Sequence, residues 1–281
     1  MKLLVDIGNS RLKWAFSTPE GLSTGGDAAL ESLSGMLPAS LLSSGPVPTG
    51  IRVANVAGPA IGTSIAAQLR RRYGLQPVFA GSASAGGGVV NGYHEPRQLG
   101  VDRWLAICAA YARHHSAVWV VDAGTATTLD HVTANGSHRG GLILPGIDLM
   151  EAVLFKRTGN LARLAAGDPV PEGDRPPRPD REVADVVADG MELGRDTATA
   201  IRMGALQATV SVIIRYLSAT DAPHLVVTGG LGRRLRSALE QAGSNGVAPG
   251  RTPAVDFRPA LVLEGLALDP PCFTEIDPST G

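Results

Sequence analysis

Residues 6–13, Asp6-Ile7-Gly8-Asn9-Ser10-Arg11-Leu12-Lys13, are flanked by apolar stretches, and the pattern returns at residues 122–128, Asp122-Ala123-Gly124-Thr125-Ala126-Thr127-Thr128. In each copy an expected strand runs into an acidic residue, a glycine and small hydroxyl or amide residues, and a second strand follows. Glycine lets the backbone come close to a ligand and leaves N–H groups pointing outward, so such a turn can hold anionic oxygens. The repeat predicts two related turns that face each other across a cleft and grip a nucleoside triphosphate.

Composition and charge narrow the class of protein. Hydrophobic residues make up 44% of the 281 residues and charged residues 18%, so the chain can build a substantial core. The net charge of −1 argues against nucleic acid or an anionic membrane as the main partner. No stretch is expected to reach the ~20 apolar residues of a membrane span, and no signal-peptide pattern opens the chain. With Cys108 and Cys272 too few for a disulfide framework or a CxxC metal site, we expect a cytoplasmic protein.

The order of expected strands and helices indicates an α/β fold with two halves, residues 1–115 and residues 116–281, and an active-site cleft between them. Each half opens with a β-hairpin that carries one of the two turns. The main expected helices run over residues 59–73, from Gly100 to about His114, and over residues 195–217. The glycine-rich stretch 82–92 is expected to be a loop too flexible to be core, and the proline-rich stretch 168–181 an exposed linker.

Four residues of the two turns are candidates for nucleotide binding. Asp6 can hold the magnesium ion that accompanies phosphates; alone it would equally suit a turn-initiating Asp, but Asp122 at the matching place favours the metal. Lys13, on the polar face of the following strand, can reach a phosphate as a point charge, whereas without the turn it would be an ordinary solvated lysine. Thr125, at the tip of the second turn, can face a ligand with its hydroxyl. Thr127 and Thr128 are attributed to strand preference.

Outside the turns, Asp102 lies in the first turn of the helix that begins at Gly100. It can be a partner of the helix dipole, worth roughly 0.3–1 kcal/mol. Equally, with Arg103 beside it, it can orient and deprotonate a substrate hydroxyl, which is most of what phosphoryl transfer needs besides positioned phosphates and a cation. Gly229-Gly230, after another strand, can lie flat against an adenine or simply form a strand-to-helix turn. The residues leave both pairs of alternatives open.

The order of these motifs resembles the type III pantothenate kinases, a family that includes proteins named Bvg accessory factors and belongs to the actin, sugar-kinase and Hsp70 ATPase superfamily. The Gly-x-Asp-Arg piece is what narrows the match to this family. The matching pieces run nearly end to end: residues 6–13, Gly100-Val101-Asp102-Arg103, residues 122–126, Gly140-Gly141 through Pro145-Gly146, Asp196-Thr197 and Thr228-Gly229-Gly230. The resemblance implies a duplicated ribonuclease H-like (actin-like ATPase) fold with mixed sheets.

The resemblance also implies a role for each site residue. ATP would be held by Asp6, Ile7, Gly8, Asn9, Ser10, Arg11, Leu12, Lys13 and Thr125, and pantothenate by Tyr93, Gly100, Val101, Asp102, Arg103 and Thr197. Asp102 would accept the proton, Asp6 would hold Mg²⁺ with ATP, and Asp122 would coordinate a monovalent cation, K⁺ or NH₄⁺. Ser10 stands where many members have threonine, which keeps the hydroxyl. Family members are homodimers that bind pantothenate close to the subunit interface.

The expected activity is therefore ATP-dependent phosphorylation of pantothenate to 4'-phosphopantothenate, the first step of coenzyme A biosynthesis. One alternative is another small-molecule kinase of the superfamily, such as a sugar kinase; many of these carry a cysteine-rich zinc motif, which Cys108 and Cys272 cannot supply. The other is a non-enzymatic transcriptional accessory factor, suggested only by the alternative family name. Asp102 and Lys13 favour catalysis over that role, and the lack of a basic run argues against direct DNA binding.

Overall fold

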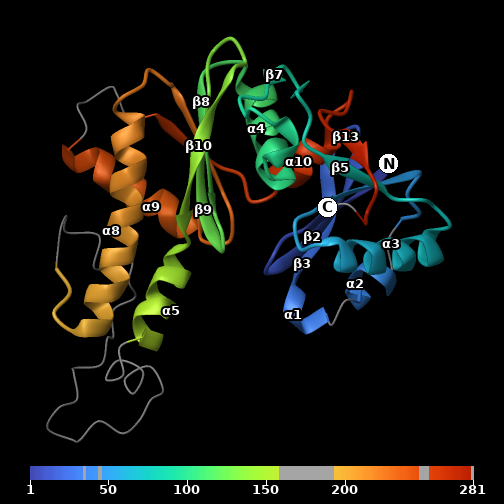
Figure 1. Cartoon of the computed structure of the whole chain (residues 1–281), viewed down its shortest axis with the longest axis horizontal. Coiled ribbons are helices and arrows are strands. Elements are labelled where there is room, and N and C mark those ends of the chain that lie inside the picture. Colours follow the sequence, from blue (N-terminus) through green and yellow to red (C-terminus); the bar gives the residue numbers. More distant parts are fainter. Residues whose placement is uncertain (34–35, 44–45, 158–192, 247–252, 280–281) are drawn as a thin grey trace, which may run out of the picture. The chain divides into compact units, whose positions relative to one another are not determined.

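The opening motif forms the hairpin that it predicts: β1 (Lys2–Ile7) pairs antiparallel with β2 (Arg11–Thr18) in the computed structural model of the chain (Figure 1). The structure describes residues 1–33, 36–43, 46–157, 193–246 and 253–279. The proline-rich stretch 168–181 therefore lies outside the described residues. The apolar residues of β1, from Leu3 to Val5 and Ile7, are fully buried, so β1 is a central strand covered on both faces.

The chain folds into two compact units. Unit 1 comprises Met1–Val120, Asp130–Gly140 and Ala260–Gly281, and unit 2 comprises Val121–Leu129 and Gly141–Pro259. The C-terminal stretch thus groups with the beginning of the chain. The division into halves at residues 115 and 116 stays a prediction.

Unit 1 is built on a six-stranded mixed sheet in the order β13-β5-β4-β1-β2-β3. β1, β4 and β5 run parallel, whereas β2, β3 and β13 pair antiparallel with their neighbours. The strands not yet bounded are β3 (Gly21–Ala29), β4 (Gly50–Asn55), β5 (Val78–Gly81) and β13 (Thr274–Ile276). This mixed sheet, with helices that contact its strands, confirms the expected α/β class.

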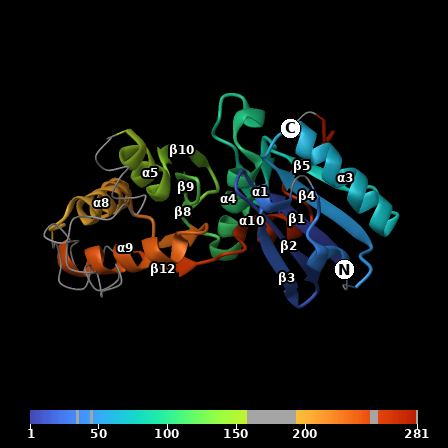
Figure 2. The same ribbon diagram turned by 90° about the horizontal axis from the view of Figure 1, so that it is seen from below.

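Helices cover the sheet of unit 1 on its two faces (Figure 2). α3 (Pro59–Tyr73), which has its proline at the first turn as expected, packs against the core on the side of Leu3, Val5 and Ile7. α4 (Val101–His114) and α10 (Leu261–Ala267) contact each other as well as β4. A side chain at Gly265 would stand 2.3 Å from the Leu105 carbonyl oxygen, so this glycine allows the two helices to meet closely.

Unit 2 holds most of a five-stranded sheet in the order β10-β9-β8-β11-β12 and the helices α5, α8 and α9. α8 contacts both α5 and α9 (Figure 1). The end of β9 and the start of β10 group with unit 1. The bounds are β8 (Val118–Ala123), β9 (Ala126–Val132), β10 (His138–Pro145), β11 (His224–Thr228), β12 (Ala254–Phe257), α5 (Ile147–Arg157), α8 (Thr197–Leu217) and α9 (Gly232–Gly246). Short elements of unit 1 are α1 (Leu30–Leu33), α2 (Ala39–Ser43) and the 3₁₀ turn η1 (Pro96–Gln98).

The glycine-rich stretch 82–92 is not the flexible loop that its composition predicted. β6 (Ala85–Gly86) and β7 (Val89–Val90) form a short hairpin there, and Val89 is buried. A side chain at Gly86 would stand 2.3 Å from the Cys272 carbonyl oxygen. The prediction was wrong because glycine serves here for close packing of backbone against backbone rather than for freedom.

The expectation that no stretch is long and apolar enough to span a membrane was also wrong. α8, with 21 residues, passes that test by length and composition. Helices that pack inside a folded protein pass it as well, so the finding is weak evidence of a membrane span. The most apolar window of α8 is only 28% buried, which means that this apolar helix presents a largely exposed face.

Candidate active site

The first turn joins β1 to β2 through Gly8, Asn9 and Ser10. The Gly8 N–H donates to the Arg11 carbonyl oxygen at 2.9 Å and closes the turn, while Asn9 and Ser10 are exposed at its tip. The Ser10 carbonyl oxygen accepts from the Leu30 N–H at 2.9 Å, which ties the tip to the residue after β3. The turn is therefore held at its base and its end, and its exposed backbone is available to a ligand.

The strand register brings the two charged candidates of this hairpin together. Asp6 lies directly opposite Lys13, so both side chains project from the same face of the sheet. The Asp6 residue is only 9% exposed, whereas Lys13 is half-buried. The alternation of side chains puts Asp6 on the face of Leu4, opposite the α3 core. A carboxylate and an ammonium group thus stand side by side next to the turn.

The other predicted nucleotide-binding residues of this stretch differ in what they can offer. The side chains of Ile7 and Leu12 are fully buried in the core, so only their backbone could meet a ligand. The Arg11 guanidinium is half-exposed and pairs with the Asp27 carboxylate of β3. Engagement of a phosphate by Arg11 would require it to share or leave that partner.

The second turn joins β8 to β9 through Gly124 and Thr125, one residue fewer than the first. The Gly124 N–H donates to the Ala126 carbonyl oxygen at 3.0 Å, and Thr125 is exposed at the tip. The Thr125 carbonyl oxygen accepts from the Gly146 N–H at 3.1 Å. A side chain at Gly146 would stand 2.4 Å from that oxygen, so the glycine of Pro145-Gly146 allows the two backbones to meet.

Gly229 lies against the head of the second turn, with a φ of +91° that favours glycine. A Cβ atom there would stand 2.4 Å from Asp122 Oδ1 and 2.4 Å from the Ala123 carbonyl oxygen. A carboxylate oxygen and a backbone carbonyl oxygen therefore converge on one point that any side chain would fill. This contact gives Gly229 a structural reason that its sequence position left open.

The Gly100-Val101-Asp102-Arg103 motif begins α4. Asp102 folds its carboxylate back over the helix start, where Oδ1 accepts from the Arg103 N–H at 2.8 Å. A side chain at Gly100 would stand 2.7 Å from that same oxygen and would displace the carboxylate, and Val101 is buried. Burial raises the pKa of Asp102 above its ordinary value, although the Arg103 N–H and charge oppose the rise. A carboxylate with a raised pKa is a better proton acceptor.

Arg103 belongs to a buried network that also includes Tyr93, Asp130 and His138. Its Nε and Nη2 donate to the two Asp130 oxygens at 2.9 and 2.7 Å, and its Nη1 donates to the Tyr93 hydroxyl at 2.8 Å. His138 Nε2 lies 3.0 Å from Asp130 Oδ1, and the His138 ring stacks on Tyr93 at a centroid distance of 6.1 Å. The structure thus brings two predicted pantothenate residues, Tyr93 and Arg103, into direct contact. Asp130 and His138, which the sequence did not single out, complete the network.

Thr197, the remaining predicted substrate contact, is the exposed first residue of α8. The Asp196 carboxylate caps this helix by accepting from the Thr199 N–H at 2.8 Å and from its hydroxyl at 2.7 Å. Those hydrogen bonds lower the pKa of Asp196. The pair Asp196-Thr197 therefore positions the start of α8.

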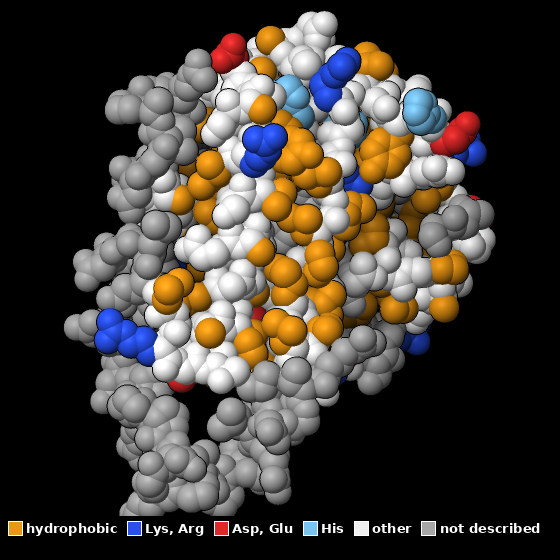
Figure 3. Space-filling model, turned by 60° about the vertical axis from the view of Figure 1, so that its left-hand side comes forward, with side chains coloured by type: hydrophobic (Ala, Val, Ile, Leu, Met, Phe, Trp, Pro, Cys, Tyr) orange, Lys and Arg blue, Asp and Glu red, His pale blue; other side chains and the backbone are white. Residues whose placement is uncertain are grey.

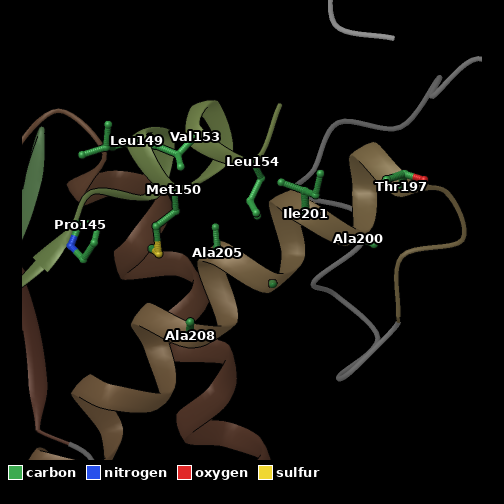
Figure 4. Close-up of a pocket in the computed structure, with 11 residues that line it drawn as sticks. Pro145, Leu149, Met150, Val153, Leu154, Thr197, Ala200, Ile201, Ala205 and Ala208 are labelled. Atoms are coloured by element: carbon green, nitrogen blue, oxygen red, sulfur yellow. The ribbon is translucent and has the colours of Figure 1, made fainter. Parts of the chain in front are cut away.

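An apolar groove of about 710 Å³ runs between α5 and α8, with Thr197 among its lining residues. Met150 and Leu154 of α5 lie across from Ile201 and Ala205 of α8 (Figure 4). Leu149, Val153 and Leu154 are each more than 40% exposed, so α5 presents large apolar side chains to its surroundings.

Comparison with known proteins identifies the family. The family model of the type III pantothenate kinases matches residues 2–219 of the chain. The chain belongs to the type III pantothenate kinase family. A type III pantothenate kinase from Cupriavidus taiwanensis is 38% identical over 265 residues, covering 85% of this chain and 90% of that protein. One from Ectopseudomonas mendocina is 33% identical over 273 residues, covering 95% and 98%.

Solved structures support the fold of this family member. A protein described as a 2-dehydro-3-deoxygalactonokinase from Sinorhizobium meliloti has a TM-score of 0.55 at 16% identity, covering 96% of this chain and 95% of its own. One described as a Baf family transcriptional activator from Campylobacter jejuni has a TM-score of 0.51 at 20% identity, covering 94% of each chain. At these identities the likeness concerns the fold alone. The expected actin-like, duplicated ribonuclease H-like fold is confirmed.

Proposed function

We propose that this chain transfers the γ-phosphoryl group of ATP to pantothenate, giving 4'-phosphopantothenate in the first step of coenzyme A biosynthesis. Family membership supports the activity. The observation that carries the assignment of the acceptor side is Asp102: it is a half-buried carboxylate with a raised pKa, held over Gly100 at the start of α4, with Arg103 as its neighbour.

In this mechanism Asp102 accepts the proton of the primary hydroxyl group of pantothenate. The hydroxyl oxygen forms a bond to the γ-phosphorus in line as the bond from that phosphorus to the β,γ-bridging oxygen breaks, and ADP leaves. Tyr93 and residues 100–103 hold pantothenate, together with Thr197. Because phosphoryl transfer depends on positioning and electrostatic stabilisation, no single group has to supply most of the rate.

ATP is held by the first turn and by Thr125. The exposed backbone of Asn9 and Ser10 meets phosphate oxygens, and Lys13 contributes a point charge. Asp6 suits Mg²⁺, because carboxylate oxygens are ligands that this hard cation prefers. When bound with ATP, Mg²⁺ neutralises part of the phosphate charge.

The second turn suits a monovalent cation, K⁺ or NH₄⁺. Asp122 supplies a half-buried carboxylate at the head of this turn, and the Gly229 backbone packs closely against Asp122 Oδ1 and the Ala123 carbonyl oxygen. When bound, the cation supplies positive charge close to Thr125 and hence to the nucleotide.

We also propose a homodimer, which the exposed apolar side chains of α5 and its groove with α8 support. Hydrophobic side chains gather in a band on the face of the molecule drawn in Figure 3. On α5, Leu149, Val153 and Leu154 are exposed, and Ile201 of α8 lines the adjoining groove; a second copy of the chain is the occupant that we propose for these side chains. Introducing a charge with Leu154→Glu should convert the dimer into a monomer in sedimentation analysis. An unchanged dimer would exclude this face as the interface.

The deciding experiment is a pantothenate phosphorylation assay with purified protein, MgATP, and either K⁺ or no monovalent activator. Formation of 4'-phosphopantothenate that increases with K⁺ is expected. If pantothenate is left untouched, the role of a transcriptional accessory factor becomes the better proposal; a preference for sugars in a substrate panel would favour a sugar kinase.

Asp102→Asn tests the proton acceptor. Turnover should fall at least ~100-fold with normal ATP binding, and near-normal turnover would exclude the role. In the wild type, turnover should decline as the pH falls through the raised pKa of Asp102, because the protonated carboxyl cannot accept a proton. A raised folded-state pKa also means that ionised Asp102 costs stability above that pKa, so the Asn variant should melt slightly higher at neutral pH.

A further inference from the structure

Tyr93 and Arg103 belong to one hydrogen-bonded network with the buried residues Asp130 and His138. We propose that Asp130 and His138 are positioning residues that orient Arg103 and Tyr93 toward pantothenate. This inference rests on the proposed function of Tyr93 and Arg103, and it adds two buried residues that contact them.

Asp130 determines how the Arg103 guanidinium is oriented. Asp130 is 1% exposed, and its two oxygens accept from Nε and Nη2 along one edge of the guanidinium. Such a bidentate pair fixes both the plane and the direction of the group. With Nη1 bonded to the Tyr93 hydroxyl, these contacts use three of the five N–H donors of Arg103. The directions of the two remaining N–H groups are thereby set as well. Recognition of the carboxylate of pantothenate requires donors in such fixed directions.

His138 extends the same constraint to the backbone beside Tyr93. Its side chain is fully buried, and an ionised Asp130 can only accept, so His138 Nε2 carries the hydrogen that Asp130 Oδ1 receives. Nδ1 is then the acceptor, and the Gly92 N–H donates to it at 3.4 Å. The Tyr93 N–H in turn donates to Asn91 Oδ1 at 3.0 Å. The backbone N–H groups of two consecutive loop residues, Gly92 and Tyr93, are thereby held by the side chains of His138 and Asn91.

Glycine at position 92 completes this arrangement. A side chain there would stand 2.0 Å from the His138 carbonyl oxygen, so the loop lies flat on the start of β10. The Tyr93 ring stacks on His138, and the Arg103 guanidinium lies 5.6 Å from the centre of the Tyr93 ring. Asp130 thus links α4 to β10 through Arg103 and His138, and these two side chains in turn contact Tyr93.

The test compares pantothenate affinity, measured by calorimetry without ATP, with KM and kcat for His138→Phe, His138→Gln and Asp130→Asn. His138→Phe keeps the ring stacked on Tyr93 and leaves the Arg103–Asp130 pair intact, but removes two hydrogen bonds. We expect about a 10-fold rise in Kd and KM for pantothenate, with kcat and the KM for ATP within about 3-fold. His138→Gln, whose amide can donate, should restore much of the affinity. Asp130→Asn should weaken pantothenate at least as much as His138→Phe.

Arg52→Gln is the matched control. Arg52 is another buried arginine of unit 1, and its Nη1 donates to the carbonyl oxygens of Leu266 and Leu268 at 2.7 and 2.8 Å. Its loss should lower the melting temperature without changing pantothenate affinity, whereas a purely structural role for His138 predicts the same behaviour in both variants.

The outcomes separate the two proposals. Unchanged pantothenate affinity in folded His138→Phe and Asp130→Asn would overturn the positioning role alone. Wild-type protein that binds pantothenate without turnover would count against the proposed function alone, since the positioning role is still read from Kd. Wild-type protein that does not bind pantothenate would overturn both.

Discussion

The two turns share a strand–turn–strand pattern but differ in the residues that surround the acidic side chain at the head of each turn. In unit 1 the acidic residue at the head of the turn, Asp6, is nearly buried and lies opposite Lys13. In unit 2 the corresponding Asp122 is half-buried, and the Gly229 backbone packs against its carboxylate. The two strand–turn–strand units therefore differ in turn length and in the residues that stand beside the acidic side chain.

The comparison indicates that a similar backbone pattern can carry different side chains in its two copies. A turn with a lysine beside its carboxylate suits phosphates together with a cation, and this is the role that we propose for the first turn. For the second turn we propose that Asp122 holds a monovalent cation alone. The two copies should therefore respond differently to equivalent substitutions.

The largest effect is expected from Asp6→Asn in the first turn. The amide keeps the shape of the side chain but removes the charge that we assign to magnesium, so turnover should fall by about 100- to 1000-fold. A magnesium titration of kcat measures the loss. Glu20→Gln, which neutralises an exposed carboxylate between β2 and β3, is the control and should keep wild-type turnover. Activity of Asp6→Asn within 3-fold of wild type would contradict the assignment.

Lys13→Met should have the next largest effect, about a 10- to 100-fold loss of kcat/KM for ATP, because a charged hydrogen bond to phosphate disappears while the length of the side chain is kept. Steady-state kinetics at varied ATP concentration provide the measurement. Lys2→Met, on the neighbouring strand β1, removes the same charge away from the turn and should be neutral. Equal effects of the two variants would mean that Lys13 is only a solvated strand lysine.

Asp122→Asn should remove activation by potassium, with turnover falling about 10-fold, to the level of wild type without the cation. The response of kcat to K⁺ concentration is the measurement. Retention of K⁺ activation would show that the cation is held elsewhere.

Gly229→Ala should also reduce K⁺ activation without any change of charge, because a Cβ there would stand 2.4 Å from Asp122 Oδ1 and 2.4 Å from the Ala123 carbonyl oxygen and would displace the Asp122 carboxylate. Gly230→Ala is a matched control, since a Cβ there has no atom within 4 Å among the described residues. The comparison is read from the K⁺ response of the two alanine variants. An identical K⁺ response in both would remove the geometric reason for the site.

Thr125→Val should have the smallest effect, a rise of about 3- to 10-fold in the KM for ATP through loss of one hydroxyl hydrogen bond. The shape of the side chain is kept, so stability should hardly change. Thr128→Val, a half-buried position of β9, is the control for strand preference. If both valines behave alike, Thr125 has no special contact with the nucleotide.

Local patterns predicted much of the fold. The period of two along β2, the proline at the start of α3 and the apolar spacing of α4 are short-range signals, and all three elements appear where they were expected. Composition was a poorer guide. The glycines of residues 82–92 suggested freedom, yet they pack against Cys108 and Cys272, which lie far away in the sequence.

The candidate site shows the same limit. The motif at Gly100 to Arg103 is contiguous, so the sequence could draw attention to Asp102. Asp130 and His138 belong to no motif. The one available signal was a carboxylate in the middle of an otherwise strand-like run, where aspartate is disfavoured. Because charged residues are seldom buried without a partner, that position could have been questioned, but its partner could not be named.

The sequence by itself therefore determined the two turns, the helix start that carries Asp102, and the family, since each depends on neighbouring residues in the chain. Only the tertiary structure decided that Asp130 holds Arg103 from 27 residues away, that Gly229 closes on Asp122, and that α8 leaves an apolar face exposed. The physical reason is that hydrogen bonds, close backbone contacts and burial depend on distance in space. Local patterns along the chain do not specify which distant residues come together, and only the folded chain does.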